Sequence, residues 1–267
     1  SVDGCSAEER RLERVLEREP PSETPEDVLE ELDRLVGLQP VKDKLHTLMK
    51  VAQRQAADRR AGKPVQSTNT HMLFLGNPGT GKTVVARLVA RFLRAIGLRS
   101  TGEFEEASRP DFVSQYNSGE CIQKMQGFIN RATGGVLFVD EAYQLADGEW
   151  IRAALETLMK EMEDRRDSLT VIFAGYEGPM QEIWKVNQGF RSRFPEANEI
   201  RFPDYSPKEL SEIFRRMCNQ RGLVLSDDAH QQAHRFLRAE SDRKRADNAR
   251  GVRNLVERIA ERLAVEG

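Results

Sequence analysis

Apolar residues along this chain follow two spacings that alternate with each other. Short apolar runs predict buried strands at 71–75, 136–139 and 169–174, and strands are also expected at 104–107 and 199–202. Between these runs apolar residues recur every three or four positions, which predicts helices over 84–96, 120–132 and 150–162. Strands that alternate with helices indicate an α/β fold with a five-stranded parallel sheet, in which ligands bind at the carboxyl ends of the strands.

The regions on either side of this pattern are predicted to be helical throughout. Thr24 and Pro25 begin a helix, and a long amphipathic helix covers 40–61. A capping box at 206–209 then opens a series of helices over 207–220, 227–240 and 250–264. We therefore expect three units, which are an arm with a linker over 1–27, an α/β unit over 28–204 and a small helical unit over 205–267.

The turn between the first strand and the next helix carries the pattern G-x-x-x-x-G-K-T over 76–83. Its glycines let backbone N–H groups converge on phosphate oxygens, and the helix N-terminus adds partial positive charge. Lys82 would reach the β- and γ-phosphates of a nucleotide, and the Thr83 hydroxyl would bind Mg²⁺. A glycine-rich turn without a ligand is the alternative, but the flanking strand and helix favour a phosphate loop. The nucleotide-binding residues expected in this segment are Asn77, Pro78, Gly79, Thr80, Gly81, Lys82, Thr83 and Val84.

Two acidic residues, Asp140 and Glu141, directly follow the apolar run 136–139. This arrangement resembles the Walker B element. Asp140 would hold Mg²⁺, directly or through water, and Glu141 would orient and deprotonate the attacking water. Hydrolysis also needs positive charge on the departing γ-phosphate, for which Arg191 and Arg193 are candidates if they reach the nucleotide of a neighbouring subunit. An ordinary surface pair is the alternative for these two arginines.

Composition narrows the possible classes of function. The 267 residues are 39% hydrophobic and 31% charged, with a formal net charge of -2, so the chain offers no broad basic field for nucleic acid. No apolar stretch approaches the roughly 20 residues that span a bilayer. Three widely spaced cysteines fit neither a disulfide framework nor a zinc cluster. We expect a soluble protein of a reducing compartment, such as the cytoplasm or an organelle stroma or matrix.

Taken together, these segments resemble the AAA+ ATPases. The set is GNPGTGKT, VLFVDEA, VIFAGY, GFRSRF and FPDYS, followed by a helical tail that carries Asn248-Ala249-Arg250. The resemblance is to the CbxX/CfqX group, which contains red-type Rubisco activases, the stage V sporulation protein K and ATPases of mycobacterial type VII secretion. It covers about 28–265 and implies a P-loop NTPase fold followed by an all-α lid, with ATP or ADP and Mg²⁺ as ligands.

The resemblance also implies roles for residues outside the phosphate loop. Arg193 matches the arginine finger best and Arg191 second, while Arg250 matches the sensor-2 arginine that links the lid to the γ-phosphate. Proteins of this kind work as hexameric rings, here of one or of two kinds of subunit, and Tyr116 matches the pore-loop aromatic that grips a protein client. The adenine pocket would be lined by Val36, Gly37 and Leu38.

This sequence departs from the wider family pattern at three places. Gly175-Tyr176 stands where most AAA+ proteins carry an Asn or Thr, so no sensor-1 residue is assigned. The segment 117–119 after the pore tyrosine is polar, and 147–150 is short. We expect an ATP-hydrolysing remodeller of a protein client. A nucleotide-gated assembly scaffold with slow hydrolysis and a red-type Rubisco activase proper are the alternatives. A nucleic-acid loader has support only from basic residues around Arg243.

Overall fold

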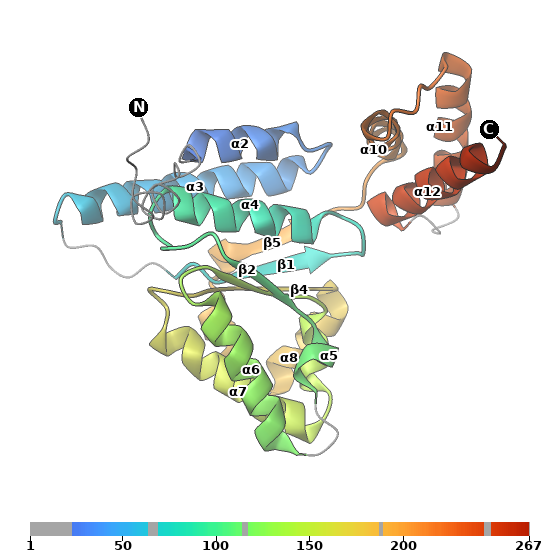
Figure 1. The fold of residues 1–267 in the computed structure, drawn as a ribbon. Helices are drawn as coiled ribbons and strands as arrows, with labels where there is room; N and C mark the ends of the chain where they lie inside the picture. The colour runs from blue at the N-terminus through green and yellow to red at the C-terminus, as the bar shows by residue number, and fades with distance from the viewer. Residues whose placement is uncertain (1–22, 64–68, 114–116, 187–188, 243–246, 267) are drawn as a thin grey trace, which may run out of the picture.

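The computed structural model describes residues 23–63, 69–113, 117–186, 189–242 and 247–266. It confirms the predicted five-stranded parallel sheet, whose strands lie in the order β2-β3-β4-β1-β5 (Figure 1). The strands are β1 (Met72–Gly76), β2 (Phe104–Ala107), β3 (Val136–Val139), β4 (Thr170–Gly175) and β5 (Glu199–Phe202). Because β1 pairs with β4 on one side and β5 on the other, the phosphate loop that follows β1 lies near the middle of one sheet edge.

Helices cover both faces of the sheet, and a separate group packs beyond its edge (Figure 1). One face carries α2 (Pro25–Arg34), α3 (Gln39–Arg60) and α4 (Lys82–Ala95). The other face carries α6 (Ser118–Ala132), α7 (Glu149–Asp164) and α8 (Glu177–Val186), with short α5 (Arg109–Phe112) and α9 (Gly189–Arg193) beside them. The third group is α10 (Pro207–Gln220), α11 (Asp227–Asp242) and α12 (Asn248–Glu266). The apolar spacing did not predict α5, α8 or α9.

Burial on both faces explains why the central strands β1, β3 and β4 are almost entirely apolar. Along β1, Phe74 packs into the core under α2 to α4, whereas Leu73 and Leu75 pack into the core against α6 to α8. Adjacent residues in a strand point to opposite faces, so a strand covered on both sides needs an apolar residue at every position.

Capping boxes begin two of the helices, one at the predicted 206–209 and one at Thr24, where the sequence predicted only a helix start. Thr24 and Asp27 cap α2 reciprocally, and Ser206 and Glu209 do the same for α10. After α2 ends at Arg34 the chain turns through residues 35–38, with Gly37 and Leu38 in the left-handed region. Residues 1–22 of the expected arm and linker lie outside the described residues, as does Tyr116.

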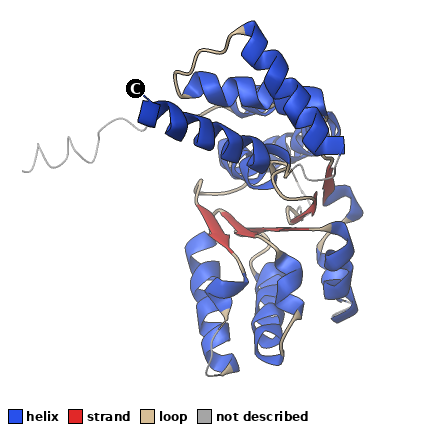
Figure 2. Cartoon of the chain, turned by 90° about the vertical axis from the view of Figure 1, so that its right-hand side faces the viewer, coloured by secondary structure: helices blue, strands red, loops and turns tan. Residues whose placement is uncertain are grey.

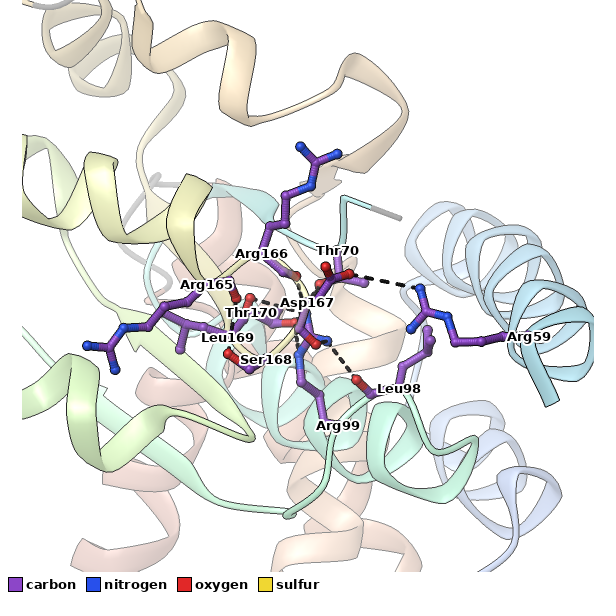
Figure 3. A network of polar contacts seen from close by, with 10 residues as sticks. All are labelled: Arg59, Thr70, Leu98, Arg99, Arg165, Arg166, Asp167, Ser168, Leu169 and Thr170. Atoms are coloured by element: carbon purple, nitrogen blue, oxygen red, sulfur yellow. Dashed lines mark hydrogen bonds and ion pairs between the residues drawn. The ribbon is translucent and has the colours of Figure 1, made fainter. Parts of the chain in front are cut away.

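A buried arginine joins the amino ends of the two central strands (Figure 3). Arg99 is 5% exposed and donates hydrogen bonds to Thr170 Oγ1 at 3.0 Å, to the Asp167 carbonyl at 3.0 Å and to the Leu169 carbonyl at 3.1 Å. Burial lowers the pKa of Arg99 to about 10, which leaves it charged at neutral pH. This contact fastens the edge of the sheet opposite the phosphate loop.

Within the described ranges, no helix is both long and apolar enough to cross a membrane.

Candidate active site

A cavity of about 620 Å³ lies where the carboxyl ends of β1 and β3 meet the group α10–α12, which is called the lid below. Figure 2 views the chain from the lid side, with strands between two layers of helices. The charged side chains that line the cavity are Arg34, Lys82, Arg216, Arg250 and Arg253 against Glu106, Asp140 and Glu141. With five basic and three acidic side chains, the cavity lining carries excess positive charge, which suits a ligand with several negative charges.

The phosphate loop leads directly into α4, which begins at Lys82. Gly79 has φ +71, and a Cβ placed there would lie 2.5 Å from the Asp247 carbonyl and 2.8 Å from the Arg250 nitrogen. The glycine is therefore needed for the close approach of the lid as well as for its backbone conformation. Thr80 is buried and donates to the Asn77 carbonyl at 2.8 Å, so its side chain stabilises the loop through an internal hydrogen bond.

Lys82 lies inside the loop with little exposure to solvent. Its Nζ donates to the carbonyls of Gly76 and Asn77, both at 2.8 Å. Burial lowers the pKa of Lys82, and the nearby Asp140 and Glu141 carboxylates oppose this shift. A charged amine that is held only by neutral carbonyls is available to exchange these contacts for phosphate oxygens.

The two acids at the end of β3 are held in different ways. The Asp140 amide donates to the Ala107 carbonyl at 2.9 Å, and the Asp140 carboxylate accepts from the Glu141 amide at 3.0 Å. Glu141 has φ 51 and begins the 3₁₀ helix η1 (Ala142–Ala146). Its carboxylate accepts a hydrogen bond from the Tyr143 hydroxyl. Both acids line the cavity together with Lys82 and Thr83.

The lid reaches the phosphate loop through the first residues of α12. Asn248 is 5% exposed, has φ 48, accepts from the Tyr205 amide at 2.9 Å and donates to the Pro78 carbonyl at 3.2 Å. Its amide also donates to Asp204 Oδ1 at 2.9 Å, and the Ala249 amide donates to the Gly79 carbonyl at 3.1 Å. These bonds place the next residue, Arg250, in the wall of the cavity.

Part of the cavity wall is apolar. It is lined by Leu35, Val36 and Leu38 from the turn before α3, and by Ile213 and Met217 from α10 of the lid. Of the predicted nucleotide-binding residues, Gly37, Asn77 and Thr80 are not among those that line the cavity. A Cβ at Gly37 would lie 2.1 Å from Glu209 Oε1, so this position faces the cap of α10.

The two arginines predicted to act on γ-phosphate are not among the described residues that line the cavity. Arg193 donates to the Met159 carbonyl at 2.8 Å and to the Gly189 carbonyl at 2.6 Å. Arg191 stacks over Trp184 at 4.6 Å from the ring centroid and lies 3.8 Å from Glu199. Within one subunit, both arginines are therefore held by contacts away from the cavity.

Comparison with known families gives two matches that follow each other along the chain. Residues 72–203 match the ATPase family associated with various cellular activities (AAA), and residues 206–266 match the AAA lid domain. This chain is a member of the AAA ATPase family. It therefore binds and hydrolyses ATP, and such proteins typically act as oligomers.

Curated relatives of this AAA ATPase align over most of both chains. Protein CbbX of Cereibacter sphaeroides is 38% identical over 243 residues, which cover 89% of this chain and 78% of CbbX. A chloroplastic ribulose bisphosphate carboxylase/oxygenase activase of Cyanidioschyzon merolae is 38% identical over 244 residues, covering 90% and 78%. Stage V sporulation protein K of Bacillus subtilis is 36% identical over 241 residues, covering 87% and 73%.

Several residues of this site were missed from the sequence, and three of them make hydrogen bonds that shape it. Tyr143 contacts Glu141, Asn248 fastens the lid, and Tyr205 donates to the Thr80 carbonyl at 3.3 Å. Burial raises the pKa of Tyr205 to about 12, so it remains a neutral donor. Asn248 and Tyr205 lie within the motifs that carried the resemblance, but no local pattern showed that they meet the phosphate loop.

Proposed function

We propose that this AAA ATPase hydrolyses Mg-ATP between the phosphate loop and the lid, and uses the energy to remodel a protein client within a hexameric ring. The α/β unit would cover 28–204 and the lid 205–267. The cavity supports this proposal because it brings Lys82, Glu141 and Arg250 around one space while Arg191 and Arg193 lie elsewhere. The arginine that would act on the γ-phosphate is therefore missing from the cavity of a single subunit, and a neighbouring subunit would have to supply it.

The apolar and the polar parts of the cavity wall suit different parts of the nucleotide. The apolar wall of Val36 and Leu38 offers a surface for adenine, and the phosphate loop offers backbone N–H groups, Lys82 and a helix N-terminus for phosphates. The Thr83 hydroxyl and the Asp140 carboxylate fit Mg²⁺, which prefers oxygen ligands. When bound, the ion would offset negative charge on the β- and γ-phosphates.

The protein groups then divide the work of hydrolysis. Glu141 would take a proton from the attacking water, while Lys82 and Arg250 would offset charge on the phosphates. Arg193 of one subunit, or Arg191 as the second candidate, would approach the γ-phosphate of the next. Such an arginine contributes on the order of 10³–10⁵ in rate where it has been measured in related phosphoryl transfer.

Complementation between two inactive variants tests whether the site is shared. Lys82→Ala removes the lysine that would contact phosphate but keeps Arg193. Arg193→Ala removes the arginine but keeps Lys82. Each variant alone should be inactive, whereas a 1:1 mixture should recover about a quarter of the wild-type rate if subunits mix at random within rings. A mixture as inactive as its components would refute sharing through Arg193, and the same pairing with Arg191→Ala would then test the second candidate.

The client part of the proposal rests on Tyr116 and on the relatives. Tyr116→Ala should leave basal ATPase activity unchanged and abolish work on a client. A Rubisco activase proper is one alternative, supported by the 38% identity to the Cyanidioschyzon activase. Restored carboxylation by an inhibited Rubisco would support it. The other alternative, a nucleotide-gated scaffold, predicts that ATP promotes assembly and that Glu141→Gln leaves partner binding intact.

A further inference from the structure

The side chain that contacts the carboxylate of Glu141 comes from the same turn. Glu141 adopts a left-handed conformation, and its carbonyl accepts from the Gln144 amide at 2.9 Å, so the chain folds back at once into η1. This turn allows the Tyr143 hydroxyl to donate to Glu141 Oε2 across two residues. Left-handed backbone at a residue other than glycine is uncommon, and at functional sites it is retained where the surrounding structure supports it.

The Tyr143 ring is held from its other side by the end of β4. It lies against the Tyr176 ring at a centroid distance of 5.8 Å and an interplanar angle of 46°. A Cβ at Gly175 would lie 3.0 Å from Tyr143 Cδ1 and 2.9 Å from Met180 Sδ. The ring therefore fills the space that a side chain at residue 175 would need, which is the position where the sequence left sensor 1 unassigned.

The hydroxyl is suited to donate rather than to accept a proton. Burial raises the pKa of Tyr143 to about 12, and the hydrogen bond to Glu141 acts in the same direction. Tyr143 thus stays protonated throughout the pH range of an ATPase assay. A donor fixed by ring packing can restrict a glutamate side chain to one orientation, since it occupies one carboxylate oxygen and leaves the other open.

We propose that Tyr143 is a positioning residue for ATP hydrolysis, which holds the Glu141 carboxylate by Oε2 and leaves Oε1 to receive the proton of the attacking water. In this step an O–H bond of water breaks, a proton joins Oε1, the water oxygen bonds to the γ-phosphorus, and ADP departs with the electrons of the broken P–O bond. Tyr143 keeps its own proton throughout. The inference rests on the proposed role of Glu141 as base.

Tyr143→Phe tests this inference because it removes the hydroxyl and keeps the ring. In the full chain at a protein concentration that saturates assembly, kcat should fall about tenfold, as expected for loss of a hydrogen bond to a charged group. KM for ATP and the melting temperature should change little. In the Glu141→Gln background, Tyr143→Phe should cause no further loss of kcat, measured by single-turnover hydrolysis.

Other outcomes would overturn the inference. An unchanged or raised kcat would show that the hydroxyl does not assist Glu141. Parallel losses of kcat and ATP affinity, or a loss that persists in the Glu141→Gln background, would show that Tyr143 only supports the local structure. If Glu141→Gln itself keeps the wild-type rate, the base assignment in the proposed function fails. If Glu141→Gln is inactive while Tyr143→Phe is normal, only the role of Tyr143 fails.

Discussion

Asn248 offers a direct test of how the lid controls the site. Its buried side chain joins the Tyr205 amide, the Pro78 carbonyl and Asp204 in three hydrogen bonds, two residues before Arg250. Replacing it with glycine keeps the left-handed backbone available but removes all three bonds. We expect Asn248→Gly to loosen the lid from the phosphate loop and to withdraw Arg250 from the cavity.

The size of the effect follows from the bonds that are lost. A typical hydrogen bond contributes about 0.5–1.5 kcal/mol net, so three bonds at Asn248 contribute on the order of 3 kcal/mol to lid docking. That energy corresponds to roughly a hundredfold change in the equilibrium for opening. Asn248→Ala loses the same bonds but keeps a Cβ, which costs about 1–2 kcal/mol relative to glycine in the left-handed region. The two variants together separate hydrogen bonding from backbone strain.

Amide hydrogen exchange at Ala249 measures this opening directly, since that amide bonds to the Gly79 carbonyl. Its exchange should accelerate by about a hundredfold in Asn248→Gly, and kcat should fall toward the value of Arg250→Ala. Exchange deep in the sheet, at the Val171 amide, is the internal control and should change far less. Wild-type exchange at Ala249 together with wild-type turnover would refute the role of Asn248 as the fastening between lid and loop.

Three further predictions concern stability and the phosphate loop. Burial lowers the pKa of His71 to about 4, so its neutral form stabilises the fold above the ordinary pKa of 6.5, and this stability is lost as the pH falls toward 4. Between pH 7 and 5 the loss should be about 2 kcal/mol, and a His71→Gln variant whose urea unfolding is equally pH-sensitive would contradict this. Arg99→Met should lower the free energy of unfolding by about 3–5 kcal/mol, and Arg99→Lys should lower it by less. Equal stability of the wild type and both variants would count against a stabilising role of the buried Arg99 hydrogen bonds. Gly79→Ala should weaken ATP binding at least tenfold, because its Cβ would lie 2.5 Å from the Asp247 carbonyl. Gly62→Ala is the matched control, since Gly62 has the same φ of +71 with nothing within 4 Å, and similar ATP affinity in both variants would exclude the lid contact as the cause.

The parts of this molecule that were predicted correctly are those encoded by neighbouring residues. A strand covered on both faces must be continuously apolar, so the segments 136–139 and 169–174 could be located from the sequence. Capping boxes join residues three apart, which made the start of α10 at Pro207 predictable. The positions of Lys82 and Asp140 at one cavity followed because parallel strands end at the same edge of a sheet.

The parts that were not predicted depend on contacts between distant segments or on an uncommon backbone conformation. Asn248 meets Pro78 across 170 positions, and no local pattern marks that pairing. Tyr143 reaches Glu141 only because Glu141 is left-handed, a conformation that its residue type does not favour. Arg99 lies in a polar stretch that looks solvent-exposed, and its burial requires carbonyls from the loop before β4.

The polar contacts differ between the amino ends and the carboxyl ends of the strands. At the amino ends of β1 and β4, Arg99 and His71 are buried and make hydrogen bonds to fixed partners, among them the Met162 carbonyl at 3.0 Å. At the carboxyl ends, Lys82 is bonded only to carbonyls that phosphate oxygens can replace, and Glu141 is held by a single side chain among the described contacts. The hydrogen bonds of Arg99 and His71 can keep the strands in register at the amino-end edge, while groups at the carboxyl-end edge exchange hydrogen-bond partners during each cycle of hydrolysis. Motion of the lid then alters the geometry around ATP, because Asn248 and Ala249 are bonded to the phosphate loop and to Asp204 at this same edge.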